Sequence, residues 1–153
     1  MKKEYIKEAF KLQEEYLVEM AIINPKMCRN LTIQVEVEQR NEGPIPHLHV
    51  YHDKSRNPRK CSYIRLDEVA YAPHHDEIKL PKKLKSQFIE LMTAPSNDYM
   101  ENNKGTVVKL NGYQTAVKTW VDTFEDDYSK FNLDEDGIVI PLDYTKLKWG
   151  KLC

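Results

Sequence analysis

The amino-acid sequence predicts an α+β fold in which helices pack on one face of a small antiparallel sheet of three to four strands. Three strand-like segments follow one another through short polar connections. Short connections favour antiparallel pairing, because parallel strands need a longer crossover. Amphipathic helical segments stand before and after the strands. The expected order is therefore α-β-β-β-α-α, followed by a C-terminal tail.

The first expected element is an amphipathic helix over residues 2–21. Its apolar side chains recur at helical spacing, while lysine and glutamate fill the opposite side. Asn24-Pro25 ends the helix, because proline disfavours helical geometry in the residue before it. This helix would cover part of the sheet.

Residues 31–38 are the clearest strand, since apolar and polar side chains alternate along them. A turn rich in polar residues and glycine follows at 41–44, and a second strand is expected over 46–53. The charged segment 53–60 then forms a solvated loop before a third strand at 61–69. Three consecutive strands of this kind predict an antiparallel meander.

The second half of the chain predicts two helices. Pro81 suits the first turn of a helix that ends before Pro95, and Asn111 is a candidate N-cap for the last helix. Residues 96–110 are polar with little periodicity, which predicts a mobile excursion. In the tail, residues 137–142 indicate an edge strand, a position that tolerates proline.

The composition indicates one soluble domain over residues 1–153, with a core over about 1–125 and an extension over 126–153. The net charge is −1 and charged residues make up 31% of the chain, so the overall charge favours neither nucleic acid nor an anionic membrane. The three cysteines form no Cys-x-x-Cys pair. That spacing predicts a reducing compartment, and we expect a cytoplasmic protein.

Three of the five histidines fall between His47 and His52, on the second expected strand. Strand alternation directs Leu48 and Val50 to the core and places His47, His49 and Tyr51 on the opposite, outward face. Glu36 of the first strand would share that face. His47, His49 and Glu36 could then bind a divalent metal, although no cofactor is required by any motif.

His47 and His49 could alternatively act as catalytic acid and base near neutral pH. A structural role competes with both chemical roles, since half-buried imidazoles can bond across strands to Glu36 or Glu38. We favour the structural role over both chemical roles, because isolated motif matches have a high false-positive rate.

A basic loop follows the histidines directly and carries Lys54, Arg56, Arg59 and Lys60. With Tyr51 as a stacking partner, Arg56, Arg59 and Lys60 could bind a phosphate or a nucleic-acid backbone. The alternative is a solvated loop whose charges keep the protein soluble.

The string Ile45-Pro46-His47-Leu48-His49-Val50 resembles the motif of histidine-triad nucleotide hydrolases and transferases. That resemblance implies His49 as the nucleophile on a nucleotide phosphate and His47 as its neighbour. The chain departs from the motif at the third histidine, where Tyr51 stands, and it lacks much of the segment that builds the nucleotide pocket.

A longer stretch resembles a small prokaryotic family described as domain of unknown function 4160. The matching pieces are Ile33 to Val37, the segment 45–50, Tyr63 to Leu66, Leu80-Pro81 and Trp120. Ile45 replaces the family's first proline, and the basic loop and the N-terminal helix are additions. The resemblance implies an α+β fold and a role in toxin–antitoxin pairs or other phage and mobile-element modules.

Three functions are therefore expected as alternatives. The first is a regulator or inhibitor of toxin–antitoxin or anti-defence type that acts by binding a macromolecular partner. The second is a metal- or histidine-dependent phosphoesterase or nuclease, and the third is a nucleic-acid-binding module that uses the loop 54–60. A protein partner is expected first, a homodimer stays open, and no membrane partner is expected.

Overall fold

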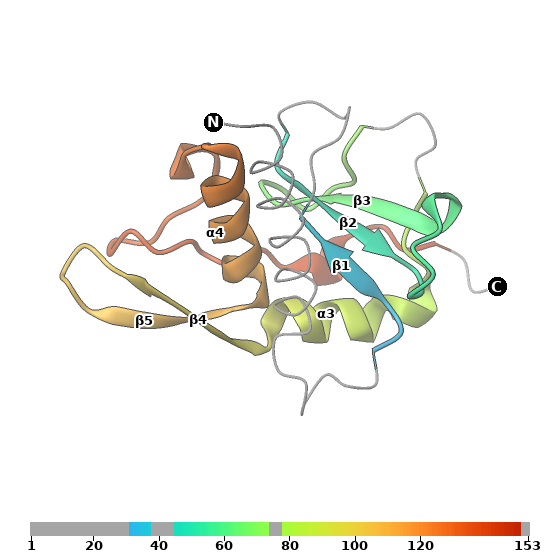
Figure 1. The fold of residues 1–153 in the computed structure, drawn as a ribbon, viewed down its shortest axis with the longest axis horizontal. Coiled ribbons are helices and arrows are strands. Elements are labelled where there is room, and N and C mark those ends of the chain that lie inside the picture. Colours follow the sequence, from blue (N-terminus) through green and yellow to red (C-terminus); the bar gives the residue numbers. More distant parts are fainter. Residues whose placement is uncertain (1–30, 38–44, 74–77, 151–153) are drawn as a thin grey trace, which may run out of the picture.

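The computed structural model of this chain describes residues 31–37, 45–73 and 78–150 (Figure 1). The predicted α+β class is confirmed, because the described residues combine two helices with two antiparallel sheets. The predicted helix over residues 2–21 lies outside the described residues. Among the described residues, no helix is both long enough and apolar enough to cross a membrane.

The larger sheet has three strands in the order β1-β2-β3, all antiparallel. Its strands are β1 (Gln34–Glu36), β2 (His47–Tyr51) and β3 (Cys61–Arg65). A short 3-10 turn, η1 (Pro58–Lys60), leads directly into β3. The predicted meander is therefore present, with strands somewhat shorter than the alternating segments of the sequence.

The second half of the chain begins with a 3-10 turn, η2 (Lys82–Leu84), that continues into helix α3 (Lys85–Thr93). Strands β4 (Pro95–Glu101) and β5 (Val107–Asn111) then form an antiparallel hairpin. The prediction of a mobile excursion at 96–110 was wrong. Gly105, at a φ of 77°, and the backbone bonds between Asn102 and Thr106 close the hairpin turn.

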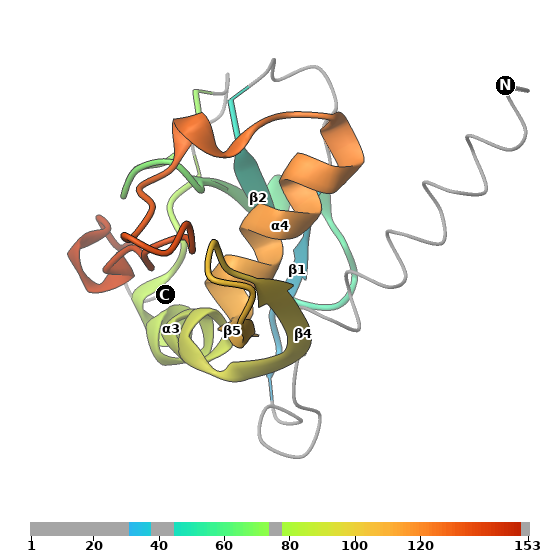
Figure 2. The same ribbon diagram turned by 90° about the vertical axis from the view of Figure 1, so that its left-hand side faces the viewer.

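Helix α4 (Gly112–Phe124) lies between the hairpin and the three-stranded sheet, as both views of the ribbon show (Figures 1 and 2). The predicted N-cap of this helix, Asn111, is confirmed. Asn111 accepts a hydrogen bond from the backbone of Gln114, whose side chain in turn accepts from the backbone of Asn111. This reciprocal capping box satisfies two donors that the first helical turn would otherwise leave open.

The main hydrophobic core joins one face of the three-stranded sheet to both helices. Leu48, Val50 and Ile64 of the sheet are fully buried and belong to the same cluster as Phe88 of α3 and Trp120 of α4. Burial of such apolar surface is the main favourable contribution to folding.

The C-terminal segment completes this core. Phe131, Val139, Tyr144 and Leu147 belong to the same buried cluster as the sheet and the helices. The expected edge strand at 137–142 does not form, and that region contributes one isolated bridge, from Leu133 to Val139. The tail is therefore held by side-chain packing rather than by strand pairing.

Candidate functional site

The histidine strand lies in the middle of the three-stranded sheet. In the strand register His49 stands opposite Glu36 on β1 and opposite Tyr63 on β3. Residues paired in this way share one face of a sheet. The predicted alternation is therefore correct, since His49 faces away from Leu48 and Val50.

The outward exposure predicted for His47, His49 and Tyr51 was wrong. Both histidines have no exposed surface, and Tyr51 is 3% exposed. The ring of Tyr63 stands edge-on against His49 with 4.6 Å between centroids, and the indole of Trp120 lies 5.4 Å from the ring of His47. Aromatic neighbours from another strand and from a helix thus enclose the two imidazoles.

The hydrogen bonds of the histidine pair assign their protons. Nδ1 of His47 lies 2.6 Å from the carbonyl oxygen of Ile45, and the Nε2 atoms of the two histidines lie 3.1 Å apart. A carbonyl only accepts, so Nδ1 of His47 carries a proton. In a neutral His47 ring Nε2 is then the acceptor, and Nε2 of His49 is the donor. The tautomers follow from this network.

Glu36 is also in the interior, at 2% exposure, and its carboxylate receives a hydrogen bond from the Arg56 guanidinium at 2.8 Å. The same guanidinium lies 5.6 Å from the ring centroid of Tyr51, which is a cation–π geometry. Tyr51 and Arg56, two of the predicted binding residues, are therefore in contact with each other. Arg56 ties the basic loop to the sheet.

The predicted metal ligands are His47, His49 and Glu36. In the part of the chain that is described, no three or more His, Cys, Asp or Glu side chains are grouped as metal ligands. The Nε2 atoms of the two histidines face each other, and the Glu36 carboxylate faces Arg56.

The other two predicted binding residues, Arg59 and Lys60, are exposed at the short turn η1. Lys60 lies beside the third histidine of the strand, because its carbonyl accepts a hydrogen bond from the backbone of His52 at 2.8 Å. Nε2 of His52 also lies 2.9 Å from the hydroxyl of Ser62. His52 is thereby held at the end of the central strand β2.

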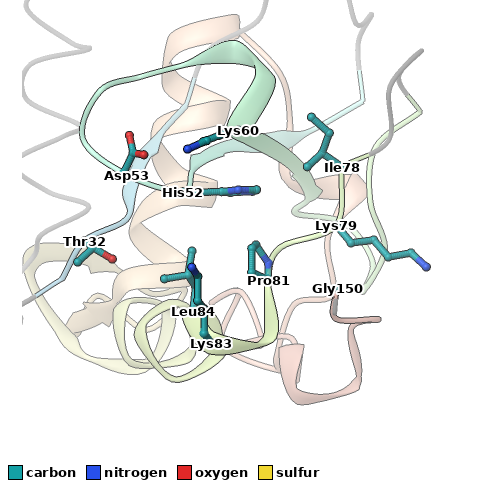
Figure 3. Close-up of a pocket in the computed structure, with 10 residues that line it drawn as sticks. All are labelled: Thr32, His52, Asp53, Lys60, Ile78, Lys79, Pro81, Lys83, Leu84 and Gly150. Carbon is teal, nitrogen blue, oxygen red and sulfur yellow. The ribbon is translucent and has the colours of Figure 1, made fainter. Parts of the chain in front are cut away.

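A pocket of about 760 Å³ opens beside His52 (Figure 3). It is bounded by the end of β2, the turn η1 and the segment around η2. Its lining residues are Thr32, His52, Asp53, Lys60, Ile78, Lys79, Pro81, Lys83, Leu84 and Gly150. Among the described residues, the lining thus combines one histidine, three lysines and one aspartate with an apolar wall.

Burial lowers the pKa of His52, and the nearby charges of Lys60 and Lys83 lower it further, against an opposing effect from Asp53. A neutral imidazole is therefore favoured at neutral pH. Sequence analysis identified Lys60 but missed Lys79 and Lys83. Their only sequence signal is the run Lys79 to Lys85, in which four of seven residues are lysine.

Comparison of the chain with protein-family models, with curated proteins and with solved structures gave no match.

Proposed function

We propose that this protein is a regulator or inhibitor that acts by binding a macromolecular partner, and that the β4–β5 hairpin carries the binding surface. The observation that supports the proposal is one exposed face of this hairpin. Tyr99 pairs with Lys109 and Glu101 pairs with Val107, so these four side chains share a face. We call these four residues the hairpin surface.

The hairpin surface has the composition of a protein-binding site. Tyr99 is 52% exposed and Val107 is 65% exposed, and both are large apolar side chains. Tyrosine is enriched at protein interfaces, where a ring supplies a large contact area. Glu101 and Lys109 beside them are exposed and supply charges of both signs. Such a mixture suits an apolar contact with a polar rim.

The hairpin is also held in shape before any partner binds. The backbone of Asn103 donates a hydrogen bond to the carbonyl of Asp136 at 2.8 Å, and Lys104 forms an ion pair with the same aspartate at 3.3 Å. These contacts join the hairpin turn to the C-terminal segment. A preorganised surface loses little conformational entropy on binding, which favours affinity.

The histidine strand also supports a binding role, because the contacts of its two histidines argue against catalysis. The side chains proposed for catalysis, His47 and His49, are enclosed by aromatic rings and bonded to each other. Their contacts favour a structural task over contact with a substrate.

The proposal is tested by affinity purification of the full-length protein from its native cell, with quantitative mass spectrometry. A double variant, Tyr99→Ser with Val107→Ser, removes the apolar part of the hairpin surface. The control, Leu133→Ser with Ile140→Ser, removes two other exposed apolar side chains, which are 39% and 46% exposed. Circular dichroism checks that both variants keep the fold.

We expect a specific protein that copurifies with the wild type and with the control and is lost with the hairpin variant. Reconstitution of that complex from the two purified proteins should show the same dependence on Tyr99 and Val107. If the hairpin variant retains every protein that the wild type binds, the hairpin surface is not the binding site and the proposal fails.

A further inference from the structure

We propose that the pocket beside His52 binds a small phosphomonoester, with the phosphate between His52, Lys60 and Lys83. This site is separate from the hairpin surface. It lies at the end of the sheet where β2 meets η1, and the hairpin projects from the opposite side of the fold (Figure 1).

Two positive side chains of the pocket, those of Lys60 and Lys83, lie on either side of the imidazole of His52 (Figure 3). In Figure 3 Lys60 approaches the imidazole of His52 from above, whereas Lys83, Leu84 and Pro81 lie below it. Lys60 and Lys83 both line the pocket with His52, and their charges lower the pKa of His52, which agrees with this placement. Lys79 lines the pocket too, but its amine points away from the ring in this view.

Asp53 is the one carboxylate among the described residues that line the pocket, and it is bonded to the turn that follows it. Asp53 accepts hydrogen bonds from the backbone of Ser55, at 2.9 Å, and from its hydroxyl. The hydroxyl first, and then the backbone of Ser55, hold the pKa of Asp53 below its usual value. Asp53 is therefore ionised and its charge acts on His52, but Lys60, Lys79 and Lys83 outnumber it among the described lining residues. Two lysines near one imidazole leave the pocket positive, which suits an anion.

The position of His52 is fixed independently of any ligand. Its backbone donates to the carbonyl of Lys60, and its ring bonds to the hydroxyl of Ser62, which is fully buried. Because Nε2 faces Ser62, the imidazole can donate to a ligand from Nδ1 in the tautomer in which the Ser62 hydroxyl donates to Nε2, while the two amines supply charge. A phosphate dianion uses both, because its oxygens accept several charge-assisted hydrogen bonds.

The apolar wall distinguishes a phosphomonoester from free phosphate. Ile78, Pro81 and Leu84 line the same pocket as the lysines. At about 760 Å³ the pocket has the size of ordinary small-molecule sites, which are largely apolar with a few placed polar groups. The organic part of the ligand would pack against this wall.

The arrangement favours a small ligand over a nucleic-acid backbone. A nucleic acid is held by cations spread along a groove that follows many phosphates. Here Lys60 and Lys83 lie above and below one imidazole (Figure 3), and Arg56 of the neighbouring loop is directed to Glu36. The site therefore provides for one phosphate.

Isothermal titration calorimetry on the full-length protein tests the assignment with two probes, adenosine monophosphate and phenyl phosphate. Adenosine and phenol, which correspond to the two probes without their phosphate, are the control ligands. The variants are Lys60→Gln and Lys83→Gln. Lys104→Gln is the matched control, because it removes an exposed lysine from the hairpin turn. Circular dichroism confirms the fold of each variant.

We expect saturable binding of at least one phosphomonoester and none of the compounds that lack phosphate. Each pocket variant should weaken binding about tenfold, since a hydrogen bond to a charged group contributes roughly that factor. The control should bind like the wild type. Inorganic phosphate should bind more weakly than the better phosphomonoester, because it cannot use the apolar wall.

Three results would overturn the proposal. One is the absence of saturable binding of both probes up to about 10 mM, a range that includes weak millimolar affinities. Another is binding that Lys60→Gln and Lys83→Gln leave unchanged. The third is tight, steeply salt-dependent binding of a single-stranded oligonucleotide by a protein that binds neither probe, which would assign the basic loop to nucleic acid.

Discussion

Nε2 of His49 lies 3.1 Å from Nε2 of His47 in the interior of the protein, and with a neutral His47 ring His49 is the donor of this hydrogen bond. The direction follows from the contact of His47 with the carbonyl of Ile45, which only accepts. The pair therefore connects the start of β2 to its middle. The contact of His47 with Ile45 also connects the segment before β2 to the sheet. Tyr63 and Trp120 pack around it. The two imidazoles behave as part of the packing of the sheet.

This internal role predicts a large loss of stability in the variant His49→Ala. The substitution removes a ring with no exposed surface and leaves His47 without this hydrogen bond. We expect the free energy of unfolding to fall by about 2–4 kcal/mol. Urea denaturation followed by circular dichroism measures it.

The variant His52→Ala is the control for His49→Ala, because His52 is half-buried at the end of the same strand. It should cost about 1 kcal/mol or less, as hydrogen bonds at partly exposed sites do. Equal stability of His49→Ala and the wild type would contradict the structural role. It would return His49 to the candidates for catalysis.

The Arg56–Glu36 ion pair predicts different effects for two arginines of the same loop. In Arg56→Ala the Glu36 carboxylate, 2% exposed, loses its bond to the guanidinium, and we expect a loss of about 1–2 kcal/mol. The estimate is modest because Arg56 is itself 41% exposed. Arg59→Ala should change stability by less than about 0.5 kcal/mol, since Arg59 is exposed.

Thermal and urea denaturation of the two variants side by side measure this difference. A second variant, Arg56→Gly, separates the ion pair from the backbone, because Arg56 adopts a φ of 55° that glycine accepts without strain. Arg56→Gly should therefore lose less stability than Arg56→Ala. If Arg59→Ala is the more damaging change, the ion pair does not anchor the loop.

The local features of the fold follow well from the sequence. Alternation predicted the strands that contain Val35, His49 and Tyr63, and the cap at Asn111 is as expected. The phase of the histidine strand was also correct. These features depend on neighbours within a few residues, and such patterns are visible along the chain.

The missed features depend on contacts between distant residues. The burial of His47 requires Trp120, which is 73 positions further along the chain and reaches it only once α4 has packed on the sheet. The pocket requires Lys83 beside His52, from a turn that no motif connects to β2. The sequence did not predict the hairpin, because Tyr99 and Val107 are mixed with polar residues on its exposed face and the strands therefore lack a clear apolar face. Burial and convergence of this kind are properties of the assembled fold.

The last prediction concerns acid stability at the end of α4. Asp126 accepts hydrogen bonds from the indole of Trp120 and from the amine of Lys130, both at 2.9 Å. Burial alone would raise the pKa of Asp126, but the bonds from Lys130, Trp120 and the backbone of Asp127 hold it below its usual value. The carboxylate is therefore more acidic in the folded protein than in the unfolded chain.

This difference fixes the direction of the pH dependence. A carboxyl whose pKa is lowered by folding stabilises the protein above its unfolded pKa, about 4, and this contribution is lost as the pH falls through the folded value. The variant Asp126→Asn should be less stable than the wild type at pH 7, and the gap should narrow as the pH falls below about 4. Urea denaturation at several pH values, followed by the fluorescence of tryptophan, measures the gap.

Asp122→Asn is the control, because Asp122 is exposed at the same helix end and pairs with Lys118 at the surface. A gap between Asp126→Asn and the wild type that stays constant with pH would show that the carboxylate does not stabilise the fold by its charge.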